Sequence, residues 1–140
     1  MGHSDIHKVL HGMFNDRDFD AMEALLDTTF AYEDVPRGLT LHDAAEFKDW
    51  LRGWTTAFSG ARIDAAQYLD GSDFSVSLSR GTGSNDGLFG YLPPTNQAMD
   101  VPHCEAMRYG SDGKAVSCRI FYDQVTLLNQ LGHITPPGAA

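Results

Sequence analysis

A single carboxylate, Asp123, interrupts a largely apolar stretch near the C-terminus, IFYDQVTLL. Burying a carboxylate costs free energy unless the group is paired, hydrogen-bonded or protonated. Desolvation beside Phe121 would raise the pKa of Asp123 toward the range that serves proton transfer near neutral pH. An ion pair with Arg119, or a hydrogen bond that caps a backbone amide, would instead make it a structural acid. The sequence therefore offers Asp123 either as a general acid/base or as a structural acid of one of these two kinds.

Asp34 and Asn85 are two further polar candidates. Asp34 follows Tyr32 and Glu33 in a strand-like segment and could act as a second acid in a proton-transfer site. An acid shortly before Pro36 is also common in a turn. The amide of Asn85 lies in a glycine-rich segment and could hydrogen-bond a substrate carbonyl or enolate oxygen, or belong to an ordinary turn. Both interpretations of each residue stay open.

Three histidines, His3, His7 and His11, recur at every fourth position and would share one face of a helix, a spacing that can bind a metal ion. No acidic residue or cysteine nearby in the sequence completes a set of ligands. We therefore expect these histidines to be exposed at the start of a helix. We expect no metal site.

The elements that must position these residues follow from the spacing of apolar side chains. Helical periodicity predicts two short helices within residues 5–26 and a third, aromatic helix within residues 41–58, on which Trp50 and Trp54 share a face. Residues 30–35 alternate, which indicates a strand. Further strand-like segments cover residues 61–69, 74–82, 99–109 and 115–128. Helices followed by a run of strands predict an α+β fold with a largely antiparallel, curved sheet packed against the helices.

Alternation along the last strand divides its side chains between two faces. Asp123 shares the first face with Phe121 and Arg119, and we expect this face to line an internal pocket below the two tryptophans. The second face carries Cys118, Ile120 and Tyr122 and, across a hairpin with a loop of two or four residues, His103, Glu105 and Met107. On this face Tyr122, Ile120 and Met107 would form an outer apolar patch for a homodimer. A loop with an odd number of residues would reverse the assignment across the hairpin and make His103 a strong candidate for a base.

Length and charge restrict the class of protein. A chain of 140 residues is long enough for one domain with a core, and residues 1–140 are interpreted as a single domain. The formal charge of −9 disfavours nucleic acid and membrane surfaces as partners, because both attract clustered lysine and arginine. The N-terminal residues lack the apolar run of a signal peptide, so we expect a cytoplasmic protein with Cys104 and Cys118 reduced.

Three motifs resemble those of the SnoaL-like polyketide cyclases, a branch of the nuclear-transport-factor-two-like superfamily. FYDQVTLLNQLG resembles the C-terminal signature of the family, GSNDGLFGYLPPTN its glycine-rich segment, and RYGSDGKAV its Asp-Gly-Lys turn. Ser84, Asp86 and Asn96 depart from the usual family residues. The resemblance implies a cone-shaped barrel in which a curved, mostly antiparallel sheet wraps around three N-terminal helices and encloses an apolar pocket, with no metal and no cofactor.

In characterised members of that family, the Asp that matches Asp123 is the general acid/base of an aldol-type ring closure. The resemblance thus implies an enzyme that moves protons on a hydrophobic carbonyl substrate and uses no cofactor. Asp123 and Asp34 would be catalytic, and the residues around the substrate would be Asn85, Arg119, Phe121, Trp54, Trp50 and Tyr32. The alternatives are an epoxide hydrolase or isomerase that uses Arg119 with Asp34 and Asp123, and a small-molecule-binding domain without catalysis.

Overall fold

The computed structural model describes residues 2–135 and 138, which form an α+β fold, as the order of helical and strand-like segments predicts. The helical elements are α1 (His3–Asp16), the 3-10 helix η1 (Asp20–Leu25), α2 (Ala44–Ala57) and α3 (Gln124–Gln130). The strands are β1 (Leu26–Asp34), β2 (Leu39–Leu41), β3 (Arg62–Asp70), β4 (Phe74–Ser84), β5 (Ala98–Tyr109) and β6 (Ala115–Tyr122). Among the described residues, no helix has the length and apolar character needed to cross a bilayer.

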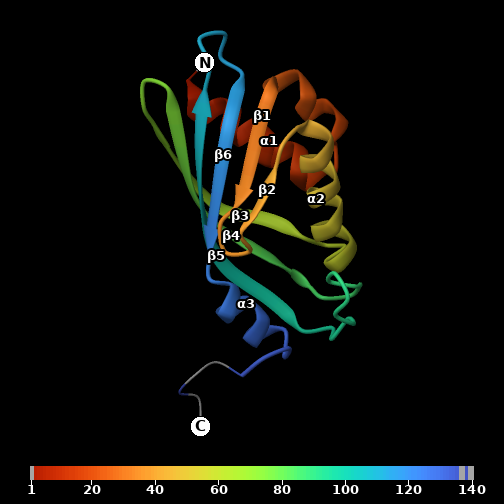
Figure 1. Cartoon of the computed structure of the whole chain (residues 1–140). Coiled ribbons are helices and arrows are strands. Elements are labelled where there is room, and N and C mark those ends of the chain that lie inside the picture. The colour runs from red at the N-terminus through yellow and green to blue at the C-terminus, as the bar shows by residue number, and fades with distance from the viewer. Residues whose placement is uncertain (1, 136–137, 139–140) are drawn as a thin grey trace.

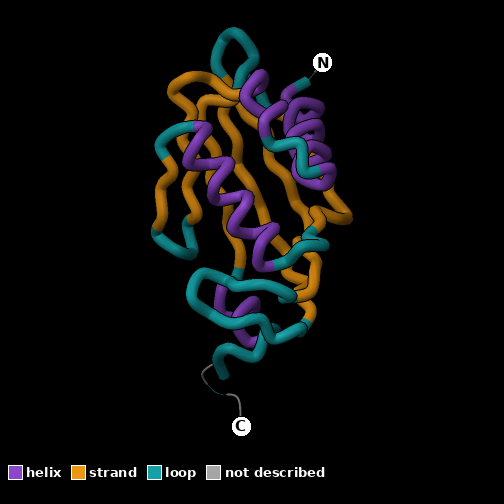
Figure 2. Tube along the Cα trace, turned by 90° about the vertical axis from the view of Figure 1, so that its right-hand side faces the viewer, coloured by secondary structure: helices purple, strands orange, loops and turns teal. Residues whose placement is uncertain are grey.

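The strands form one curved sheet in the order β2-β1-β6-β5-β4-β3 (Figure 1). The β1–β6 pair is parallel and every other pair is antiparallel. The sheet does not close into a barrel, because β2 and β3 are free edges. Helices α1 and α2 lie across one face of the sheet, with α1 against β3 and β4 and α2 against β1 (Figure 2). The space between these helices and the sheet holds the core.

The β5–β6 hairpin has the strand register that fixes the functional face. Its loop covers residues 110–114, an odd number that by itself would reverse the two faces. The register of the β5–β6 pair shifts by one residue at a bulge between Arg108 and Tyr109. This shift restores the pairing expected for a loop with an even number of residues, so His103 pairs with Tyr122. The grouping of His103 and Tyr122 on one face is therefore confirmed.

The assignment of the two faces to the inside and outside was wrong. The face with Met107, Ile120 and Tyr122 looks toward the helices, and Met107 and Ile120 are buried. The face with Arg119 and Phe121 is exposed. The face with Met107, Ile120 and Tyr122 is the more apolar of the two, so burying it removes more hydrocarbon surface from water. The Arg119 guanidinium on the other face stays hydrated. The expected outer patch for a dimer is consequently part of the interior.

The predicted strand over residues 115–128 was also too long. Strand β6 ends at Tyr122, and α3 begins one residue after Asp123. The Asp123 carboxylate accepts hydrogen bonds from the Thr126 backbone N–H (3.1 Å) and hydroxyl (2.7 Å). An Asp followed three residues later by Thr is a typical N-cap pairing, because it satisfies a backbone donor that the first helical turn leaves open.

Candidate functional site

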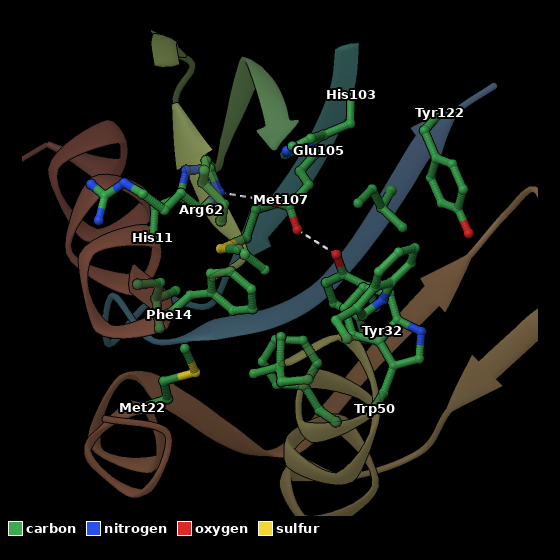
Figure 3. A pocket seen from close by; sticks show the side chains of 18 of the residues that line it. His11, Phe14, Met22, Tyr32, Trp50, Arg62, His103, Glu105, Met107 and Tyr122 are labelled. Carbon is green, nitrogen blue, oxygen red and sulfur yellow. Dashed lines mark hydrogen bonds and ion pairs between the residues drawn. The ribbon is translucent and has the colours of Figure 1, made fainter. Parts of the chain in front are cut away.

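A cavity of about 110 Å³ lies between the inner face of the sheet and helices α1 and α2 (Figure 3). Most of its wall is hydrocarbon; examples are Phe14, Met22, Leu51, Met99, Val101 and Leu127. A few polar side chains interrupt this wall; they include His11, His103, Glu105, Tyr32 and Tyr122. Apolar walls with few polar groups are typical of sites for small hydrophobic ligands.

His103 presents an imidazole to this cavity from β5. The Ser79 hydroxyl lies 3.3 Å from each of its ring nitrogens, so neither nitrogen is held in a short, linear hydrogen bond. Burial lowers the pKa of His103 below its usual 6.5, although the nearby Glu105 charge acts in the opposite direction. His103 is therefore neutral at pH 7 and has a ring nitrogen able to accept a proton.

Glu105 is the centre of a buried hydrogen-bonded cluster on the same strand. Its Oε1 lies 2.5 Å from His11 Nε2, and the Tyr32 hydroxyl donates to Oε2 (Figure 3). His7 Nε2 lies 3.4 Å from the same Oε1. Burial alone would raise the pKa of Glu105, but the hydrogen bonds from His11 and His7 outweigh it and hold the pKa well below 4.5. Glu105 is a carboxylate at neutral pH.

The expectation that the N-terminal histidines are exposed was wrong, since His3 is half-buried and the other two are buried. His7 and His11 are only 0% and 7% exposed. Helix α1 turns these two side chains toward the sheet, where Glu105 reaches them from a position 94 residues beyond His11. Their acidic partner is therefore remote in the sequence, so the residues near His7 and His11 in the chain do not indicate it.

Asp34 lies at the end of β1 and is completely buried. Its carboxylate accepts hydrogen bonds from Trp50 Nε1 (3.1 Å) and the Tyr122 hydroxyl (2.9 Å), and Arg37 lies 3.8 Å away. Burial raises its pKa, partly offset by the hydrogen bonds from Tyr122 and Trp50. Asp34 thus holds two residues of the cavity wall in place.

Trp50 and Trp54 differ in the hydrogen bonding of their indole N–H groups. Trp50 donates to Asp34, whereas the buried Nε1 of Trp54 has no acceptor among the described residues. A buried donor without a partner is costly in most native structures. Trp54 also lines the cavity, which makes this N–H a candidate donor to a ligand oxygen.

Asn85 is fully buried, but its hydrogen bonds go to backbone groups. Its Nδ2 donates to the carbonyl oxygens of Ala57 (3.1 Å) and Gly87 (3.0 Å), and its Oδ1 accepts from the Thr95 N–H (3.1 Å). The amide therefore fixes the segment after β4 against the end of α2. The expectation that it hydrogen-bonds a substrate is not supported by this geometry.

Asp123, Arg119 and Phe121 lie outside the cavity. Asp123 is exposed, and its hydrogen bonds to Thr126 lower its pKa. Arg119 Nε lies 2.9 Å from Glu33 Oε1, and its guanidinium covers the Phe121 ring at 5.2 Å. The prediction that Asp123 projects into an apolar hollow was therefore wrong. Arg119, Asp34 and Asp123 are likewise not brought together as an epoxide hydrolase would need.

Replacing Asp123 with alanine tests whether this residue lies outside the site and serves only as the N-cap of α3. We expect a modest fall in melting temperature, because α3 loses its N-cap, and no loss of any activity that depends on the cavity. Asp43→Ala, which removes the carboxylate that accepts from the Glu46 N–H at the start of α2, is the matched cap variant. Turnover that disappears in Asp123→Ala while the fold is retained would contradict the placement of Asp123 outside the site.

Glu105, Tyr122 and His103 were missed as site residues because their shared face was interpreted as external. Glu105 and Tyr122 were placed correctly beside His103 by strand alternation, but on the face interpreted as external. The signal that identifies them is the composition of that face, in which a lone acid and a histidine stand among apolar neighbours.

Comparisons with known proteins agree with this architecture. The model of the SnoaL-like polyketide cyclase family matches residues 4–131. No curated protein sequence matches the chain significantly.

Solved structures with this fold include three informative neighbours. A proposed SnoaL-like polyketide cyclase from Jannaschia sp. CCS1 has a TM-score of 0.84 at 18% identity, over 96% of this chain and 93% of that one. IdmH of Streptomyces antibioticus, a proposed polyketide cyclase, has a TM-score of 0.79 at 21% identity, over 94% and 99%. AclR of Streptomyces galilaeus, a proposed hydroxylase, has a TM-score of 0.81 at 17% identity, over 95% and 97%. At these identities the likeness shows the fold alone.

Proposed function

Because the chain belongs to the SnoaL-like polyketide cyclase family, we propose that it catalyses proton transfer on a hydrophobic carbonyl compound, of the kind that drives an aldol-type ring closure. The observation that carries this proposal is the pairing of a neutral imidazole, His103, with an uncommitted indole N–H, Trp54, on the wall of one apolar cavity. The first is a proton acceptor and the second a hydrogen-bond donor for an oxygen that becomes negative.

The proposed reaction needs no oxidant or reductant. A nitrogen of His103 takes a proton from the carbon next to a carbonyl group, and the electron pair of that C–H bond moves to the carbonyl oxygen as an enolate. The Trp54 N–H donates to this oxygen. The enolate carbon then attacks a second carbonyl carbon of the same molecule, a C–C bond forms, and the resulting alkoxide takes the proton back from His103. Each proton is returned, so the enzyme is unchanged after one cycle.

Asp34 has a positioning role in this proposal instead of the acid/base role expected from the sequence. Its carboxylate accepts from the Tyr122 hydroxyl and the Trp50 N–H, and both of those residues line the cavity. Tyr122 also packs edge to face on Trp54, with ring centroids 6.0 Å apart. Asp34 thereby fixes the aromatic wall that orients Trp54. Tyr32 is committed to Glu105 and contributes ring surface only.

The dimensions of the cavity indicate the substrate class. Its volume of about 110 Å³ is below the roughly 300–1,000 Å³ typical of sites for drug-sized ligands. A separate groove of about 440 Å³ between α2 and β2 shares Trp50 and Trp54 with it. We propose that the cavity holds one ring of the substrate, and that the rest of the molecule lies in the groove beyond the two indoles.

Hydrogen–deuterium exchange tests this function without knowledge of the natural substrate. The probe is 2-tetralone, a two-ring ketone with an acidic benzylic position, followed by NMR in heavy water at neutral pH. Wild-type protein should exchange this position faster than buffer. Trp54→Phe keeps an aromatic ring but removes the N–H, and should lower the exchange rate about 100-fold, as loss of one oxyanion donor does elsewhere.

The control is Asp43→Ala, which alters the start of α2 on the exposed side of the protein. It should exchange the ketone at the wild-type rate. Binding of 2-tetralone without any exchange above buffer would favour a non-catalytic binding protein and overturn the proposal. Equal rates for Trp54→Phe and wild type would remove Trp54 from the mechanism.

A further inference from the structure

Three buried side chains other than His103 and Trp54 bring one possible ligand atom each close together. These residues, His7, His11 and Glu105, are called the His-Glu cluster below. One donor atom from each lies within 4.8 Å of the other two. His7 and His11 come from successive turns of α1 and Glu105 from β5. Two imidazole nitrogens and one carboxylate oxygen are a common donor set for Zn²⁺.

A chain of hydroxyl groups places one hydrogen of the His7 ring on Nδ1. The Tyr109 hydroxyl donates to the His3 carbonyl oxygen (3.0 Å), which can only accept. Its contact with Ser75 (2.7 Å) is then made by the Ser75 proton, and Ser75 Oγ in turn accepts from His7 Nδ1 (2.8 Å). Nδ1 of His7 therefore carries a hydrogen. In the neutral ring the lone pair is on Nε2.

Nε2 of His7 faces the carboxylate of Glu105, and it donates a hydrogen bond there only while the ring carries a second proton; without that proton it presents its lone pair. His7 Nε2 lies 3.4 Å from Glu105 Oε1, and His7 is completely buried. Two electron-rich atoms directed at each other in a dry interior repel unless a proton or a metal ion lies between them. The hydroxyl chain thus leaves His7 Nε2 oriented as a ligand.

The other two members of the cluster are held in the same manner. His11 Nδ1 lies 2.7 Å from the Tyr68 hydroxyl, and the Tyr32 hydroxyl donates to Oε2 of Glu105. In each of the three side chains, the polar atom that is not a possible metal ligand therefore has a hydrogen-bond partner of its own. Such outer hydrogen bonds orient metal ligands and select the imidazole tautomer in known metal sites.

We propose that the His-Glu cluster binds one divalent transition-metal ion of the zinc type through His7 Nε2, His11 Nε2 and Glu105 Oε1. The nitrogen donors disfavour Mg²⁺ and Ca²⁺, which take oxygen ligands. Ligands on tetrahedral zinc lie about 3.3 Å apart, so the 2.5 Å contact between His11 and Glu105 must open by less than about 1 Å. Because His11 and Glu105 line the cavity, an open coordination position would face the ligand space.

Cobalt titration tests the site without reference to turnover. The full chain, stripped with a chelator and dialysed, is titrated with Co²⁺ and followed by its visible d–d absorption, and Zn²⁺ is then added as competitor. We expect about one Co²⁺ per chain, displaced by Zn²⁺. His11→Gln should abolish the absorption, whereas His42→Gln, a change of an exposed histidine, should leave it intact.

Two serines of β4 give a matched pair for the outer hydrogen bonds. Ser75→Ala removes the hydroxyl that holds His7 and should weaken Co²⁺ binding about 10- to 100-fold. Ser77→Ala removes an equally buried hydroxyl that has no partner among the described side chains, and should bind Co²⁺ as wild type does. Circular dichroism establishes that each variant is folded. If His11→Gln does not fold, the serine pair carries the comparison.

Absence of Co²⁺ absorption in the folded wild type would overturn the proposal and leave a proton as the occupant between His7 and Glu105. Equal affinities for the two serine variants would also overturn it. Exchange of 2-tetralone is measured separately in chelator, so failure of the metal site and failure of the proposed proton transfer are distinguishable.

Discussion

Replacing His103 with alanine is expected to reduce ketone exchange by about 100- to 10,000-fold, the usual contribution of a positioned general base. His103 loses no strong hydrogen bond, since among the described residues its only side-chain partner is Ser79, whose hydroxyl lies 3.3 Å from each ring nitrogen. The loss should therefore fall on the rate of proton transfer, with little change in melting temperature. NMR exchange rates and thermal unfolding of the same samples measure the two effects. His42→Ala, on the exposed surface, is the matched histidine change.

The pH dependence identifies the base more specifically than the rate alone. Burial lowers the pKa of His103 below 6.5, so the catalytically useful neutral form predominates at neutral pH. The apparent kcat/KM for exchange should be flat from about pH 7 upward and fall on acidification, with a midpoint below 6.5. The acid limb should disappear from the residual activity of His103→Gln. A limb that persists with the same midpoint would assign the titration to another group, such as Asp34.

Fold class was readily predicted from the sequence because the apolar spacing is strong in the relevant segments. The aromatic helix around Trp50 and Trp54 forms as α2, and the four later strand-like segments all pair in one sheet. The faces of the hairpin were also predictable, since alternation survives the combination of an odd loop and a bulge. Alternation groups the residues of each face, but it does not indicate against which face the helices pack.

The site was harder to predict for a related reason. Asp123 was interpreted as buried because it follows a run of apolar residues, yet the chain changes from strand to helix at that residue. The Thr126 N–H donates a hydrogen bond to its carboxylate. This local interaction, and not the apolar neighbours in the sequence, determines where the side chain lies. Glu105, the acid that is buried, gains its partners from α1, and no local pattern reports a contact between residues 94 positions apart.

The buried Glu105 carboxylate should be the most sensitive single position for stability. Glu105→Ala leaves His7, His11 and the Tyr32 hydroxyl without their common acceptor. Removing one partner of a buried ionic cluster typically costs about 3–5 kcal/mol in the free energy of unfolding, because the remaining polar groups stay desolvated. Urea unfolding in chelator measures this cost without any contribution from a bound metal.

The matched acid is Glu33, which pairs with Arg119 at 2.9 Å on the exposed face of the sheet. Water screens that pair, so Glu33→Ala should cost less than about 1 kcal/mol. A Glu105→Ala variant no less stable than Glu33→Ala would contradict the view that the interior cluster contributes substantially to the fold.

Acidification of the wild-type protein should remove the contribution of the Glu105 carboxylate to the free energy of unfolding. The pKa of Glu105 is well below its unfolded value of about 4.5, so between the two values the unfolded chain binds the additional proton. Stability from this group is complete above about pH 5 and is lost as the pH falls toward the folded pKa. The difference in unfolding free energy between wild type and Glu105→Ala should therefore be constant near neutral pH and shrink below pH 4.5. A difference that stays constant down to pH 3 would mean that the histidines, and not the ionised carboxylate, account for the stability of the cluster.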